Sequence, residues 1–206
     1  MKNLKKVFSV VLVSLMAVMV LVSCGPKVSP EDTTKIFLDV VLKDDKTNMD
    51  KIGIKEKDYT DFKKEEDTAI DESFKASGMD SSILTDDVKA TLKSNILKGL
   101  STLTYEVTPV SSEGNKATVT VKIKPFDMEK IVKDGQSKIM EKVLANPSMS
   151  EKEIYQEAFK IIGESIAAGT VKDQAKSVTI SLTKEGNLWV PSEDDVKNIM
   201  TTVMAE

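Results

Sequence analysis

The sequence contains no histidine, no arginine and only one cysteine. Without histidine, the chain lacks the usual general base near neutral pH, the usual serine or cysteine triads and the usual zinc ligand sets. Glycine-rich phosphate loops, EF-hand loops and dinucleotide-binding fingerprints are absent as well. The common hydrolytic mechanisms are therefore excluded, and we expect a protein that is not an enzyme and that binds no metal or cofactor.

Arginine is replaced throughout by lysine, so no planar guanidinium is available to bind phosphate or guanine through two parallel hydrogen bonds. The chain has 33 acidic against 29 basic residues, a formal charge of −4. A surface of this sign is repelled by phosphate backbones, so we expect no nucleic-acid partner. The exclusive use of lysine also suggests an AT-rich genome, which favours a low-GC Gram-positive source.

The single cysteine, Cys24, follows a long apolar run near the N-terminus. Lys2, Lys5 and Lys6 precede that run, which extends from Val7 to Val22. This layout is typical of a secretory signal peptide. A membrane-spanning helix needs ~20 apolar residues, so the run is slightly short for a permanent anchor.

The residues Leu21-Val22-Ser23-Cys24 resemble a bacterial lipobox. The resemblance implies that residues 1–23 are a lipoprotein signal peptide and that the Cys24 thiol carries diacylglycerol on the extracytoplasmic face of the cell membrane. Two acyl chains make a stable anchor, because each buried methylene adds ~0.8 kcal/mol of membrane affinity. The alternative is an uncleaved transmembrane helix in which the cysteine is incidental. Residues 24–29 would form a short tether, since five extended residues reach at most ~18 Å.

Residues 30–206 are long enough for a single domain with its own core. Ser29 as N-cap, Pro30 at the first position and Asp32 at the third predict the start of the first helix. Apolar residues at helical spacing predict further helices over residues 56–76, from the N-cap Thr85 to about Gly99, over 127–144, over 151–168 and from the N-cap Ser192 through Val203. Ser150 and Glu153 should form a capping box at the start of the helix over 151–168. Gly78 should follow the end of the second helix, and Asp195 should occupy the third position of the last one.

The period of the apolar residues changes to two in the segments that remain. Residues 103–107 and 117–123 alternate apolar with polar side chains, as do residues 178–182 before the short segment 188–190. This pattern predicts two antiparallel hairpins with one dry and one wet face. Both connecting turns contain Glu-Gly-Asn, which indicates shared turn chemistry rather than duplication.

The fold class that follows is α+β, with an antiparallel curved sheet of two hairpins packed on helices and a helical pair inserted at about residues 127–168. The order of helices, then "ATVTVKIKPFD", then "SVTISLTKEGNLWVPS" resembles cystatin-like and NTF2-like folds. The mature chain also resembles a domain family of unknown function found in lipoproteins of low-GC Gram-positive bacteria. That second resemblance implies no activity.

Three aromatic residues are candidates to line a ligand pocket between the sheet and the helices: Tyr105, Phe126 and Trp189. The alternative is that they are core or edge-covering residues. Asp67 and Asp71 lie one turn apart within an acidic tract and could be interpreted as a cation site. The neighbouring lysines favour a solvated, charge-mixed helix face instead.

Three functional hypotheses from different classes remain. We favour a noncatalytic module that binds a small ligand or peptide. The second hypothesis is a structural subunit that docks on an envelope protein through an exposed apolar patch, with the helical pair as its surface. The third is an enzyme that uses a carboxylate pair or a serine and lysine dyad.

Overall fold

The computed structural model describes residues 28–76 and 80–204, so the predicted signal peptide, Cys24 and Gly78 lie outside the described residues. The elements follow one another as α2 (Pro30–Lys43), the 3-10 helix η1 (Met49–Ile52), α3 (Glu56–Ala76), α4 (Asp86–Ser101), β1 (Tyr105–Glu113), β2 (Lys116–Ile123), α5 (Met128–Ala145), α6 (Glu151–Ala167), β3 (Lys176–Glu185), β4 (Leu188–Pro191) and α7 (Glu193–Val203). The predicted α+β class is confirmed. Within the described residues, no helix has the length and apolar composition needed to cross a bilayer.

The four strands form one antiparallel sheet in the order β1-β2-β3-β4. β3 pairs with β2 along the whole length of β2, from Lys116 opposite Thr183 to Ile123 opposite Lys176, although α5 and α6 separate the two strands in sequence. The helical pair is therefore an insertion that leaves a simple meander intact.

The two hairpin turns are built alike, as their shared sequence predicted. Gly114 has a φ of 58° and Gly186 a φ of 60°, a left-handed conformation that glycine adopts without a Cβ penalty. The first hairpin is longer than expected, because pairing continues from Ser111 to Glu113 beyond an irregularity after Pro109. The turn is thus reduced to two residues, and the sequence "SSEGN" is mostly strand.

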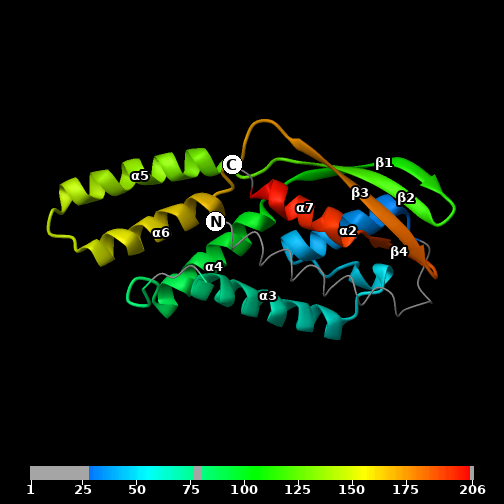
Figure 1. Cartoon of the computed structure of the whole chain (residues 1–206), viewed down its shortest axis with the longest axis horizontal. Helices are drawn as coiled ribbons and strands as arrows, with labels where there is room; N and C mark the ends of the chain where they lie inside the picture. The colour runs from blue at the N-terminus through cyan, green and yellow to red at the C-terminus, as the bar shows by residue number, and fades with distance from the viewer. Residues whose placement is uncertain (1–27, 77–79, 205–206) are drawn as a thin grey trace.

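One face of the sheet is dry and carries the core. Val119, Val121 and Ile180 are fully buried there. The helices α2 and α7 lie under this face (Figure 1) and contact its strands. The opposite face is wet, so the alternation of the sequence was interpreted correctly.

The two helices on the sheet differ in how their N-termini are capped. The Ser29 hydroxyl accepts a hydrogen bond from the Asp32 N–H at 3.1 Å, as predicted. Ser192 occupies the N-cap position of α7, but its side chain makes no capping hydrogen bond. The Asp195 carboxylate instead accepts the Ser181 N–H of β3 at 2.9 Å. The expected local cap is thus replaced by a tertiary contact that joins α7 to the sheet.

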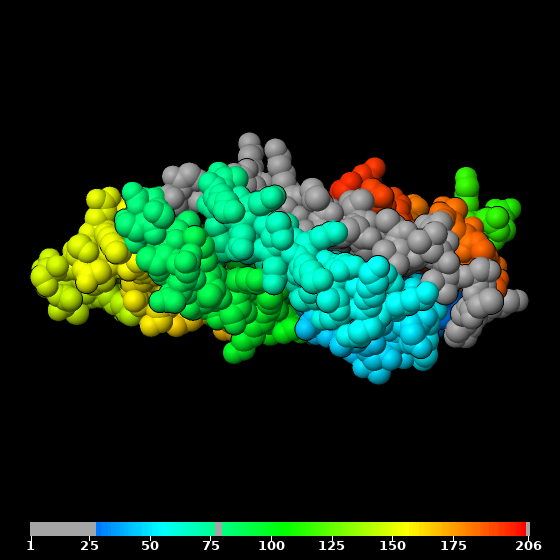
Figure 2. Space-filling view, turned by 90° about the horizontal axis from the view of Figure 1, so that it is seen from below, coloured from blue at the N-terminus to red at the C-terminus, as the bar shows by residue number. Residues whose placement is uncertain are grey.

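The helices α5 and α6 form an antiparallel arm that extends away from the sheet (Figure 1). In the space-filling view, the yellow arm forms one end of an elongated molecule (Figure 2). α6 packs on α4, and α5 packs on α6. The predicted apolar stripes of the arm are only partly buried: Ile131 and Ile166 are inside, whereas Val132, Ile139 and Val143 are half-exposed.

Candidate functional site

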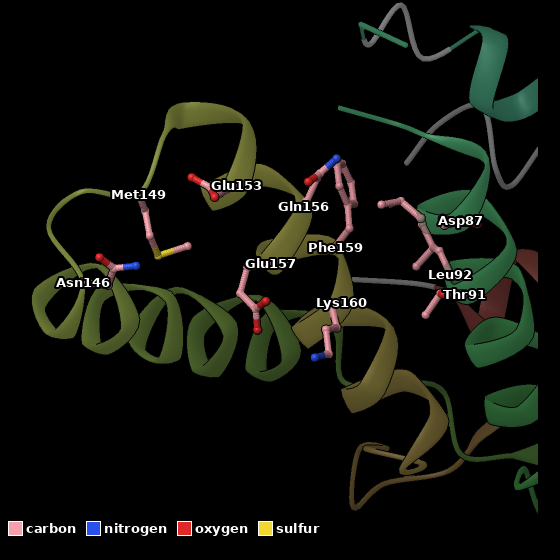
Figure 3. A pocket seen from close by; sticks show the side chains of 11 residues that line it. Asp87, Thr91, Leu92, Asn146, Met149, Glu153, Gln156, Glu157, Phe159 and Lys160 are labelled. Atoms are coloured by element: carbon pink, nitrogen blue, oxygen red, sulfur yellow. The ribbon is translucent and has the colours of Figure 1, made fainter. Parts of the chain in front are cut away.

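A cleft of about 400 Å³ opens between α4, α6 and the loop that joins α5 to α6. Its volume lies within the range of ligand-binding pockets in proteins. Figure 3 shows the side chains of α4 and α6 across the cleft, with those of the loop near its other end. The lining residues are Asp87, Val88, Thr91, Leu92, Asn146, Met149, Glu153, Gln156, Glu157, Phe159 and Lys160.

Close contact between α4 and α6 positions the two sides of the cleft. A Cβ at Gly99 would lie 2.5 Å from the Ile166 carbonyl oxygen, and one at Gly163 would lie 3.0 Å from the Asn95 amide nitrogen. The two glycines therefore let the helix backbones approach closely at one end of their crossing. Beyond this contact, the first turns of the helices carry larger side chains, and these enclose the cleft.

The floor of the cleft is apolar. Val88, Leu92 and Phe159 are half-buried and pack against the hydrophobic core, and Met149 covers the floor from the loop. Helical spacing places Val88 and Leu92 one turn apart on the same face of α4. A ligand with an apolar group would displace water from this floor and gain free energy from burial.

The polar rim is held by hydrogen bonds around the start of α6. The Glu153 carboxylate accepts the Ser150 N–H and hydroxyl, both at 2.8 Å, which completes the predicted capping box. These hydrogen bonds lower the pKa of Glu153 below its ordinary value, because they favour the ionised form. The Gln156 amide donates to the carbonyl oxygens of Ser82 and Ile83, which fixes the loop before α4. Glu153 is therefore a fixed anion rather than a proton donor at neutral pH.

The charged groups of the rim are mostly acidic. Asp87, Glu153 and Glu157 face one cation, Lys160. Glu157 forms an ion pair with Lys142 of α5. Among the described side chains, neither Asp87 nor Lys160 has an ion-pair partner. The site thus combines an apolar floor with an acidic rim, in which Glu153 is held by hydrogen bonds from Ser150 and Asp87 and Lys160 form no ion pair with another described residue.

The three aromatic residues predicted to line a pocket lie away from this cleft and do not converge. Phe126 is fully buried, and its N–H donates to the Val203 carbonyl oxygen at 2.9 Å. Trp189 is 8% exposed, with the Lys184 ammonium 5.7 Å from its ring centroid. The space between sheet and helices at Phe126 is filled by side chains of the core.

Tyr105 makes a structural contact and does not line the cleft. Its hydroxyl donates to the Asp39 carboxylate of α2 at 2.6 Å, and the Lys43 ammonium lies 4.7 Å from its ring centroid. Burial, together with the Asp39 carboxylate, raises the pKa of Tyr105 above its ordinary value. The phenol therefore stays protonated and joins the first strand to α2.

The acidic tract of α3 is largely a charge-mixed face. Asp67 forms an ion pair with Lys93 of α4 at 2.5 Å, and Glu66 is buried beside Lys63. Within residues 28–76 and 80–204, no three acidic side chains cluster as candidate metal ligands. The contact with Lys93 shows that part of this tract joins two helices.

The residues of the cleft were not selected from the sequence. Two signals were present, because Thr85 and Ser150 were recognised as caps that begin the two helices lining the cleft. Both caps form: the Thr85 hydroxyl accepts the Val88 N–H and the Ser150 hydroxyl accepts the Glu153 N–H. The sequence did not show that α4 packs against α6. This contact depends on the absence of a Cβ at Gly99 and Gly163.

The sequence matches a known family over most of its length. Residues 25–204 match the model of a family described as Domain of unknown function (DUF5105), so the chain belongs to that family. The predicted membership of a family of unknown function is confirmed. No curated protein matches the sequence.

A solved structure from Bacillus subtilis subsp. subtilis strain 168 has a similar fold. It is YcdA, described provisionally as a lipoprotein, with a TM-score of 0.69 and 20% sequence identity. The similarity covers 85% of this chain but only 56% of YcdA, so this chain spans little more than half the length of that protein. The description of YcdA agrees with the Gram-positive lipoprotein family that the lipobox and composition predicted.

Proposed function

We propose that this protein is an extracytoplasmic lipoprotein that is anchored through diacylglycerol on Cys24 and binds a peptide segment in the α4–α6 cleft without catalysing a reaction. The lipobox and the description of YcdA support the anchor. The observation that carries the binding role is the cleft itself, with its apolar floor and acidic rim.

The chemistry of the cleft favours one kind of peptide. An apolar side chain would fit against Leu92 and Phe159 on the floor. A basic residue beside it would face the carboxylates of Asp87 and Glu153, where opposite charges attract. We therefore expect a segment in which lysine or arginine flanks an apolar residue.

The side chains of the cleft argue for binding over catalysis. A general acid at neutral pH needs a raised carboxyl pKa, and the pKa of Glu153 is lowered. Glu157 is neutralised by Lys142. The rim therefore consists of fixed charges, which are suited to recognition.

Peptide binding can be tested on the lipidated protein in nanodiscs. Two fluorescent tetrapeptides, Lys-Leu-Phe-Lys and Glu-Leu-Phe-Glu, would be titrated by anisotropy. The lysine peptide should bind more tightly, and its binding should weaken as salt screens the exposed charges. Equal affinity of the two peptides would reject the role of the acidic rim.

Two pairs of variants locate the binding site. Thr91→Trp places an indole in the cleft and should abolish binding, whereas Thr68→Trp on the exposed face of α3 should leave it unchanged. Asp87→Asn should weaken binding by up to about fivefold, the range of an exposed ion pair, and Asp71→Asn should not. Full affinity in Thr91→Trp would reject the cleft as the site.

The anchor has a separate test. Cys24→Ala should leave an unprocessed precursor, because the modified thiol is required for cleavage at a lipobox. Normal processing of this variant, measured by its mass, would contradict the anchor.

A further inference from the structure

We infer that the apolar stripe of the arm pairs with the same stripe of a second copy of this chain, parallel and in register, while both copies are anchored to one membrane. This inference rests on the proposed anchor but not on the proposed peptide. The arm is α5 with α6, and the stripe is the apolar groove between them. The groove has a volume of about 540 Å³ and is lined by Val132, Gly135, Gln136, Ile139, Met140, Val143, Ala158 and Ile162.

The arm carries an unusual share of the exposed apolar surface. In the described part of the chain, four large hydrophobic residues are exposed, and three of them lie on the arm: Met140 at 62%, Leu144 at 72% and Tyr155 at 46%. Met140 lines the groove, and exposed apolar surface of this kind marks an interaction site in a soluble domain. Leu144 occupies a b position, outside the seam described below. The rest of the molecule is called the body below, and among its described residues the one exposed large hydrophobic residue is Val110.

The stripe on α5 has the spacing of a coiled-coil seam. Val132 and Ile139 are seven residues apart and occupy the d positions of a heptad, and Gln136 and Val143 occupy its a positions. α6 continues the seam with Tyr155, Ala158 and Ile162, which are three and four residues apart. A helix of the second copy would therefore lie in the groove with the knobs-into-holes packing of a helical bundle.

Gln136 argues for a partner with the same sequence in the same register. It is the only polar side chain among the residues that line the groove. Burying its amide against an unrelated apolar helix would leave the amide without a hydrogen-bond partner, which costs free energy. Two Gln136 amides that meet across a parallel, in-register seam can bond to each other, as single polar residues at a positions do in coiled coils.

The flanking positions of the seam bring no like charges together. In a parallel pair, each g residue meets the e residue of the next heptad on the other helix. Along the stripe the g positions are Gly135 and Lys142 and the e positions are Lys133 and Met140, while the preceding g residue, Met128, is buried in the core. Gly135 would meet Met140, and the e position that Lys142 would meet, residue 147, lies beyond the end of α5. Each contact therefore contains at most one charge, and a second copy is not repelled.

The anchor gives both copies a common direction. The C-terminal half of α2 contacts Tyr105, which pairs with Ile123 near the start of α5. The N-terminus of α2, which continues toward Cys24, therefore points away from the arm, as Figure 1 shows. Two copies anchored at this end would both direct their arms away from the membrane, and their α5 helices would run parallel.

Confinement to a surface also compensates for the small size of the contact. From Val132 to Val143 the stripe is about 17 Å long at 1.5 Å per residue, which is short for a dimer that is stable in solution. Anchoring two copies in one membrane raises their effective concentration without adding a contact. Pairing is therefore expected in the membrane and not in dilute solution.

Disulfide cross-linking in intact membranes tests this arrangement. The lipidated Cys24 has no free thiol, so an introduced cysteine is the only reactive one. Gln136→Cys and Val143→Cys, each expressed alone, should give covalent dimers under mild oxidation. Ser137→Cys, which points away from the seam at a b position, is the matched control and should stay monomeric. Adding Ile139→Asp to Gln136→Cys should abolish the dimer, with helix content checked by circular dichroism.

Each outcome supports or rejects the inference. Dimers of Gln136→Cys without dimers of Val143→Cys would mean an antiparallel contact and would overturn the parallel one. Anchored protein that gives no dimer, or as much dimer with Ser137→Cys, would overturn pairing while leaving the anchor intact. Protein found in the medium and monomeric would overturn both, and membrane fractionation distinguishes these two failures. Peptide binding should be unchanged in Gln136→Cys, since this residue is not in the cleft.

Discussion

The body of the molecule and its arm bury their apolar side chains to different degrees. In the body, residues such as Phe37, Phe126 and Ile180 are at most 1% exposed between sheet and helices. In the arm, Ile131 and Ile166 are comparably buried, but much of the remaining stripe is half-exposed. A sheet covered on one face by helices encloses a core, whereas two helices side by side cannot cover each other completely. The arm therefore retains apolar surface that the body does not have.

The two proposed binding sites both lie on or beside the arm. The cleft lies where the arm joins the body through α4, and the groove lies between the two arm helices. Neither lies between the sheet and the helices, where the fold resemblance placed a ligand. Both proposed binding surfaces therefore involve the inserted helices, with α4 forming the other side of the cleft.

The largest loss of folding stability should come from a substitution in the core of the body. Phe126→Ala should lower the free energy of unfolding by about 3–5 kcal/mol, because it removes a fully buried ring and leaves a cavity. Denaturant unfolding followed by circular dichroism measures this change. A loss below about 1 kcal/mol would mean that the body is no better packed than the arm.

The joint between arm and body should be the next most sensitive point. Gly99→Ala should cost about 1–3 kcal/mol, because the new Cβ would lie 2.5 Å from the Ile166 carbonyl oxygen and must push α6 away. Gly135→Ala is the matched control, since its Cβ would lie 3.6 Å from the nearest atom, a side-chain carbon of Ile162. The control should gain up to about 1 kcal/mol from helix propensity. Unfolding curves that rank the two variants in the opposite order would contradict the close joint.

The exposed stripe should be nearly neutral for folding. Met140 is 62% exposed, so Met140→Ala should change the free energy of unfolding by less than about 0.5 kcal/mol. The same unfolding assay, performed in dilute solution, provides the comparison with Phe126→Ala. A loss above about 2 kcal/mol would show that this side chain is part of a core, and the arm would then not differ from the body in its packing.

The smallest effect should be a local dependence on pH at the tip of the arm. Hydrogen bonds from Ser150 lower the pKa of Glu153, so the stabilisation that they give is present above the ordinary carboxyl pKa and is lost as pH falls through the lowered one. The amide chemical shift of Ser150 should follow this titration in NMR spectra. Glu153→Gln should remove the dependence, and a Ser150 shift that titrates equally in both proteins would reject this assignment.

Local rules predicted most of the elements. Ser29, Thr85 and Ser150 each begin a helix where the sequence placed it, and the bounds of α3 agree with residues 56–76. The glycine turns and the alternation of β2 were also predicted. Caps, turns and periodicity depend on residues within a few positions of one another, and so they can be recognised in the sequence.

Long-range contacts limited the prediction of the site. Tyr105, Phe126 and Trp189 were recognised as aromatic residues at the sheet, but their alternation could not show whether a cavity lay beside them. The Asp195 carboxylate was expected near its own helix start, yet it binds the Ser181 N–H across the fold. The cleft required α4 and α6 to meet, although residues 102–150 lie between these helices in sequence.

The sequence by itself determined the α+β class, the positions of the helices and hairpins, the exclusion of histidine and arginine chemistry, and a lipobox. The tertiary structure decided that β2 and β3 pair around the inserted arm, that the core beneath the sheet is filled, and that apolar surface remains on α5 and α6. The physical reason is that an apolar stripe in a sequence specifies which face avoids water. Only the packed chain decides whether another element covers that face.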